Sequence, residues 1–185
     1  MLYRSLLALF LATGLMAVLP AAAQITVNRP PALIEAVRTG NVDELRRLLA
    51  QDGNPNLQDQ DGRTLLMLAA GTGNIALVRI LLDARANVGL TDRLGNTVLY
   101  WAAGSGNVDV VQALLDAEAP VDQQNREGVT PLMAAARGGH LAVVDRLLEA
   151  GADPTRTDFT GRSAAMWAEE SRVRAVVDRL RAAGD

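Results

Sequence analysis

The chain has 185 residues, of which 49% are hydrophobic, 3% aromatic and 21% charged, and this composition excludes disorder over the whole length. Its net charge of -3 excludes a general attraction to nucleic acid or to anionic lipid. Because it contains no cysteine, neither disulfides nor a thiolate metal site can stabilise the fold.

The first residues have the pattern of a secretory signal peptide. Arg4 precedes an apolar run over residues 5–19, and three alanines precede Gln24. We therefore predict a signal peptide over residues 1–23, with a mature chain that leaves the membrane after cleavage. An uncleaved anchor is the alternative, although this run is shorter than the roughly 20 residues that span a bilayer. All basic residues are arginine and alanine is abundant, which indicates a bacterial source.

The rest of the chain repeats with a period of 33 residues. Glycine recurs at this step at Gly62, Gly95, Gly128 and Gly161. Alanine recurs at Ala36, Ala69, Ala102, Ala135 and Ala168, and leucine recurs at Leu48, Leu81, Leu114, Leu147 and Leu180. Three independent columns agree without an insertion, which indicates an array of similar structural units.

One unit shows the predicted elements most clearly. Thr130 is placed to cap a short helix, Pro131 suits its first turn, and two glycines at 138–139 end it. Residues 141–150 carry apolar side chains on one face of a second helix. Residues 151–161 are rich in Gly, Asp and Thr, which predicts an extended loop or hairpin.

These motifs resemble the ankyrin repeat, whose pattern G-x-T-P-L-x-x-A-A-x-x-G is followed by L-L and G-A-D. The resemblance covers residues 28–185 of a domain that we expect over 24–185. It implies an all-α fold, an ankyrin-repeat α-solenoid of about five helix-turn-helix units with projecting β-hairpin loops. The predicted units are 28–58, 59–91, 92–124, 125–157 and 158–185. Two short helices cannot bury their apolar faces alone, so each unit must pack against its neighbour.

The sequence departs from the family pattern in two columns. The family's histidine after Pro-Leu is replaced by Met67, Tyr100, Met133 and Met166, so apolar contact must replace its hydrogen bonds. The glycine of G-A-D is kept as Gly151 but is replaced elsewhere by Asp52, Arg85 and Glu118. If those three residues are left-handed, each costs about 1 kcal/mol relative to glycine, and we expect a moderately stable array.

Candidate catalytic residues are few. His140 is the single histidine, and it occupies the position that opens a second helix, which favours a structural role. Asp59 and Asp61 lie in a predicted hairpin, where aspartate sets turn geometry. Trp101 and Trp167 share a column with leucine and alanine, which favours core packing over stacking on a ligand. We predict no catalytic residue, no metal site and no cofactor, and therefore no enzyme.

The resemblance also implies where a partner binds, because ankyrin proteins hold folded proteins on the concave side formed by hairpin tips and first helices. The predicted protein-binding residues are Arg63, Arg93, Leu94, Asn96, Arg126, Glu127, Arg137, Phe159 and Arg162. The same mapping includes Arg38, Gln60, Asp61, Val129, Thr160 and Glu170. Arginine and aromatic side chains are enriched among interface hot spots, and a hairpin tip has no core in which to bury Phe159.

The sequence thus predicts a monomeric, periplasmic or secreted protein that binds another protein without chemistry of its own. The partner relation is either inhibition, as by an immunity protein, or protection and assembly of an envelope enzyme. Two alternatives remain open: an envelope scaffold held by an uncleaved signal anchor, and an exported effector that acts on host proteins. The partner itself is not written in the sequence.

Overall fold

The computed structural model describes residues 31–184, and the predicted signal peptide lies outside them. Within the described residues the chain forms ten α-helices in five helix-turn-helix pairs. The first helices of the pairs are α1 (Ala32–Arg38), α3 (Leu65–Gly71), α5 (Val98–Ser105), α7 (Pro131–Gly138) and α9 (Ala164–Ser171). The second helices are α2 (Val42–Leu49), α4 (Ile75–Asp83), α6 (Val108–Asp116), α8 (Leu141–Glu149) and α10 (Arg174–Gly184).

Side-chain caps begin most of these helices at matching positions. The hydroxyl groups of Thr64, Thr97, Thr130 and Ser163 each accept a hydrogen bond from a backbone N–H of the first turn in α3, α5, α7 and α9. The side chains of Asn41, Asn74 and Asn107 do the same for α2, α4 and α6. The helix predicted around Pro131 is confirmed, with Thr130 as its cap and Gly139 left-handed at φ 72° after its last turn.

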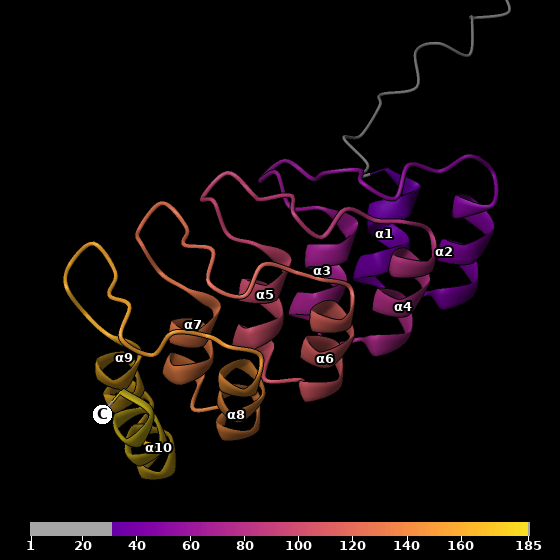
Figure 1. Cartoon of the computed structure of the whole chain (residues 1–185). Helices are drawn as coiled ribbons and strands as arrows, with labels where there is room; N and C mark the ends of the chain where they lie inside the picture. The colour runs from indigo at the N-terminus through magenta and orange to yellow at the C-terminus, as the bar shows by residue number, and fades with distance from the viewer. Residues whose placement is uncertain (1–30, 185) are drawn as a thin grey trace, which may run out of the picture.

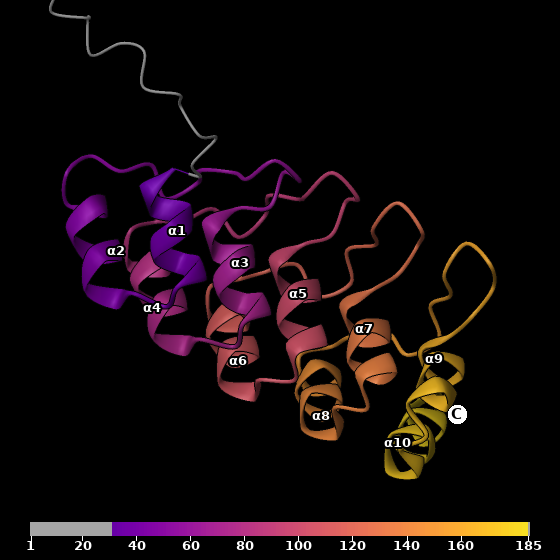
Figure 2. The same ribbon diagram turned by 180° about the vertical axis from the view of Figure 1, so that it is seen from behind.

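The helices form two layers, one of first helices and one of second helices (Figures 1 and 2). Each helix packs against the corresponding helix of the next unit. The leucine and alanine columns supply the core between the layers: Leu81, Leu114 and Leu147 are fully buried, and Leu180 nearly so. This is the arrangement of an α-solenoid, in which every unit completes the core of its neighbours.

The loops between units project together on one side of the array (Figure 1). β structure in residues 31–184 is limited to three isolated antiparallel bridges, Gln58 with Thr64, Thr91 with Thr97 and Thr157 with Ser163. The predicted hairpins are therefore present as closed loops, but they lack extended strands.

The two departures from the family pattern have the predicted local effects. Met67 and Met133 are buried, so apolar packing fills the column where the family has histidine. Met166 is 52% exposed, because no described unit packs against the outer side of α9. The three residues that replace the loop glycine are left-handed, which meets the condition set for their strain: Asp52 (φ 62°), Arg85 (φ 62°) and Glu118 (φ 61°).

Candidate protein-binding surface

A buried aspartate or asparagine holds each projecting hairpin in shape. This column consists of Asp59, Asp92, Asn125 and Asp158. In each residue Oδ1 accepts hydrogen bonds from the backbone N–H groups two and four positions further on, at 2.9–3.0 Å. The turn role predicted for Asp59 is confirmed, and these four side chains fix the geometry of the surface that a partner meets.

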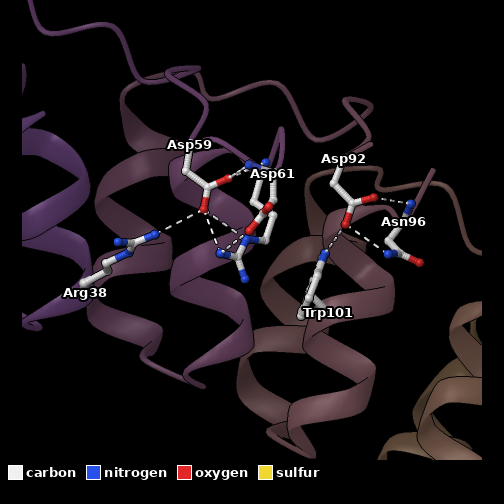
Figure 3. A network of polar contacts seen from close by, with 7 residues as sticks. Arg38, Asp59, Asp61, Asp92, Asn96 and Trp101 are labelled. Carbon is white, nitrogen blue, oxygen red and sulfur yellow. Dashed lines mark hydrogen bonds and ion pairs between the residues drawn. The ribbon is translucent and has the colours of Figure 1, made fainter. Parts of the chain in front are cut away.

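The remaining oxygen of each aspartate in this column is also occupied. Oδ2 of Asp92 accepts from the indole Nε1–H of Trp101 at 3.1 Å, and Oδ2 of Asp158 accepts from that of Trp167 at 3.0 Å. Oδ2 of Asp59 instead accepts from Arg63 at 2.8 Å and from Arg38 at 3.3 Å. Figure 3 shows the networks around Asp59 and Asp92 side by side on adjacent hairpins.

These contacts lower the pKa of two of the carboxyl groups, those of Asp59 and Asp158. Burial by itself would raise the pKa of Asp59 and of Asp158. In Asp59 the hydrogen bonds from Arg63 and Asp61 outweigh burial, so its pKa lies below the ordinary value. In Asp158 the hydrogen bonds from Thr160, Arg162 and Trp167 have the same effect on the pKa. Both groups are therefore charged at neutral pH and act as fixed acceptors.

The hairpin tips, residues 59–63, 92–96, 125–129 and 158–162, are joined to one another through the backbone. The N–H groups of Arg93, Arg126 and Phe159 donate to carbonyl oxygens of the preceding tip at 3.0–3.1 Å. Their side chains lie over the glycine of that tip, where an added Cβ at Gly128 would come within 2.7 Å of Phe159. The tips thus form one connected row with its side chains held in order.

Most predicted contact residues lie exposed on this row. Phe159 is 72% exposed and Leu94 is 63% exposed, and Arg93, Arg126 and Glu127 are also exposed. Arg137 is exposed at the end of α7. Their exposure matches the prediction, whereas a binding role for them stays a prediction.

Two predicted residues of the row are already engaged within the protein. Arg63 is half-buried and pairs with Asp59 at 2.8 Å and with Asp61 at 3.0 Å. Arg162 pairs with Glu170 and lies 3.9 Å from the centroid of the Trp167 ring. These guanidinium groups are positioned by the fold, so a partner would meet them in a set orientation.

The prediction for Asn96 is wrong. Its side chain is 4% exposed, and Nδ2 donates to Asp92 at 2.9 Å while Oδ1 accepts from Asn125 at 2.8 Å. Val129, in the same mapping, is also buried. Asn96 therefore joins two adjacent hairpins, and its buried amide is not presented to a partner.

Sequence reasoning missed a hollow of about 310 Å³ on the side of the first helices. Its lining includes Tyr100 and Trp101 of α5, Ala134 and Arg137 of α7, and Trp167 of α9. The two tryptophans pack partly on the core, as predicted, but they are half-buried and also line this hollow. The sequence did contain a sign that the tryptophans have a polar partner, because each one follows an aspartate of the hairpin column by nine residues.

The other candidate chemical groups have structural contacts. Nε2 of His140 lies 3.2 Å from the carbonyl oxygen of Gly104 and can only donate to it, which ties two units together. Two adjacent carboxylates at the end of α9, Glu169 and Glu170, pair separately with Arg181 and Arg162. No group of three potential metal ligands gathers in the part of the chain that the structure describes. In that same part, every helix is too short or too polar to cross a membrane.

Comparison with known families identifies the repeat. A model of ankyrin repeats matches three overlapping stretches, residues 33–125, 77–158 and 117–184, which together cover nearly all described residues. No curated protein matches the chain. Ankyrin-repeat proteins are typically non-catalytic scaffolds that bind other proteins.

Proposed function

The chain belongs to the ankyrin-repeat family, and on this premise we propose that it is an exported protein that binds another protein through its concave face. By concave face we mean the hairpin tips together with the outward sides of α3, α5, α7 and α9. Protein binding follows from the family, while the surface, the export and the kind of partner are the proposal.

The exposed row along the tips is the observation that carries this proposal. Phe159 and Leu94 present large apolar side chains to solvent where no core can receive them. Arg93 and Arg126, which alternate with them along the row, make no ion pair within the described residues. Phenylalanine and arginine, two of the residue types on this row, are enriched in protein–protein interfaces.

The signal-peptide pattern before the array supports a periplasmic or secreted location. In that compartment a monomer of this kind would inhibit an enzyme or toxin, or would protect and assemble an envelope enzyme. An envelope scaffold on an uncleaved anchor and an exported effector on host proteins are the other functions that the same surface would serve.

Affinity capture with the full chain, tagged at its C-terminus and purified from the compartment where it accumulates, tests the proposal. One variant removes the row by Arg93→Ala, Arg126→Ala and Phe159→Ala. A matched control removes two exposed arginines and one exposed leucine from the second helices by Arg46→Ala, Arg79→Ala and Leu141→Ala.

A partner that the native and control proteins hold and that the row variant loses would support binding through the tips. Circular dichroism must show that all three proteins are equally folded. Equal capture by the row variant would refute the assignment of the surface. Recovery of the tagged protein with its first 23 residues still present would instead favour the scaffold.

A further inference from the structure

The hollow beside the tips arises because one unit breaks a column of large side chains. Trp101, Ala134 and Trp167 occupy equivalent positions in three successive units, so the small alanine stands between two indole rings. Gly71 and Gly104 widen the space, since a Cβ added at Gly104 would meet no atom within 4 Å. The result is an opening of about 310 Å³, at the lower end of ligand pockets, which are roughly 300–1,000 Å³.

The aromatic walls of the hollow are held in place from behind. Each indole N–H is bonded to a buried aspartate of the hairpin column, Trp101 to Asp92 and Trp167 to Asp158. The ring of Tyr100 meets that of Trp101 edge to face, with centroids 6.0 Å apart and an interplanar angle of 87°. Arg162 covers one face of the Trp167 ring, 3.9 Å from its centroid, and the anchored rings present their remaining apolar surface to the hollow.

Among the described residues that line the hollow, Arg137 is the one that carries a charge. Arg137 lies 5.6 Å from the centroid of the Trp167 ring and makes no ion pair within residues 31–184. Asp92 and Asp158, the carboxylates nearest to the indoles, are buried and already accept hydrogen bonds. Glu170 is neutralised by Arg162. An incoming carboxylate would therefore meet an uncompensated guanidinium.

The spacing of the units sets the size of the occupant. Packed helices lie about 8–10 Å apart, so Trp101 and Trp167, two units apart, start from backbones roughly 16–20 Å apart. An extended chain advances roughly 3.3–3.6 Å per residue, so about five residues cover that distance. A short loop segment fits this span better than a single small molecule does.

We propose that the hollow receives an acidic loop of the protein partner, with a large apolar side chain between Trp101 and Trp167 and a neighbouring carboxylate on Arg137. This inference rests on the proposed function, because it names the chemistry of the partner segment that the concave face takes. The charge complementarity is local, since the chain as a whole carries a net charge of -3.

Peptide titration followed by NMR tests the inference. The probe is Ac-Gly-Phe-Asp-Gly-NH₂, with Ac-Gly-Phe-Asn-Gly-NH₂ as an uncharged peptide of the same shape and phenylacetate as a small acid. The chain has two tryptophans, so its ¹H–¹⁵N spectrum contains two indole signals, both from the hollow. We expect the Asp peptide to shift both signals saturably and to bind about tenfold more tightly than the Asn peptide.

Two variants separate the aromatic part of the site from the charged part. Ala134→Leu fills the hollow with a side chain that the column already holds at Leu68, and it should abolish binding of both peptides. Arg137→Gln should remove the difference between the peptides, and Arg137→Lys should restore part of it. Two sharp, dispersed indole signals and a native Tm in each peptide-free variant would show that the walls are intact.

The proposal is overturned by equal affinity for the two peptides, by unimpaired binding to the Ala134→Leu variant, or by no saturable shift up to about 10 mM peptide. Tighter binding of phenylacetate than of the Asp peptide would overturn it too, in favour of a small-molecule site. In the capture experiment, a partner that the Ala134→Leu variant retains but the row variant loses would refute binding in the hollow and leave the proposed function intact. If both variants still captured the partner, the proposed binding surface itself would be refuted.

Discussion

Three left-handed residues offer a direct test of how the loops limit the stability of the array. Asp52, Arg85 and Glu118 have φ angles of 61–62°, and the equivalent fourth-unit residue is Gly151, at φ 88°. A side chain in this region costs roughly 1–2 kcal/mol because its Cβ crowds the following carbonyl group. The combined variant Asp52→Gly, Arg85→Gly and Glu118→Gly should therefore be more stable than the native protein.

The expected increase in the free energy of unfolding is the difference between two opposing effects. Glycine relieves roughly 1–2 kcal/mol of strain per site, but it returns about 0.4–1 kcal/mol of conformational entropy to the unfolded chain. The three side chains are exposed and make no ion pair within the described residues, so little else is lost. The net gain is about 0.5–1 kcal/mol per site and about 2 kcal/mol for three separated sites.

Thermal and urea unfolding measure this gain. For a chain of this size about 2 kcal/mol raises Tm by roughly 4–8 °C. The matched control is Ala84→Gly with Ala117→Gly, one residue earlier in two of the same loops, where φ is -78° and -88°. There glycine relieves no strain and should destabilise the protein. If both sets of glycines lowered Tm equally, the strain argument would be wrong.

Three further predictions concern the hairpins. Asp158→Asn should cost about 1–3 kcal/mol in urea unfolding because its amide would face the indole N–H of Trp167, and it should cost less when combined with Trp167→Leu. The pKa values of Asp59 and Asp158 are lowered in the folded protein, so the free energy of unfolding should be constant above the ordinary aspartate pKa of about 4 and should decrease as the pH falls below about 4. Urea unfolding at a series of pH values from about 7 to about 2 measures this decrease, and a constant free energy over the whole range would contradict the prediction. Gly161→Ala should lower the free energy of unfolding by roughly 1–2 kcal/mol because position 161 is left-handed. Gly128→Ala should lower it by at least about 1 kcal/mol more because the new Cβ would also contact the next hairpin. Equal melting temperatures of the two variants would contradict an effect of that contact.

The architecture could be predicted from the sequence because its determinants recur at one spacing. The caps at Thr64, Thr97 and Thr130 act within a single helix turn, so a local pattern is enough to place them. The buried leucines recur at the same position of each unit, so their packing partners are known once the units stack. Alignment of Arg85 with Gly151 also marked it as a position where the backbone could be left-handed, as it is in the structure.

The errors arose where side chains of adjacent units meet. Asn96 occupies a tip position that the family exposes, yet its amide bridges Asp92 and Asn125 of the next hairpin. The core packing predicted for Trp101 is confirmed, but the alignment gave no sign that its ring also lines the hollow. Alignment of single units averages over such contacts, since they depend on the pair of residues that two different units bring together.

Those pairwise contacts also separate the parts of the sequence that support the array from the parts that shape its surface. In the hairpin column, Asp92 and Asp158 accompany a tryptophan nine residues later, whereas Asn125 accompanies Ala134. An asparagine is tolerated at 125 because no indole N–H there needs an acceptor, and its amide instead donates to Asn96. The unit that has the small Ala134 at the tryptophan position is the one that opens the hollow. Strict repetition therefore maintains the stack, and positions where repetition fails, such as Ala134 and Arg137, are those from which a partner would distinguish one unit from the next.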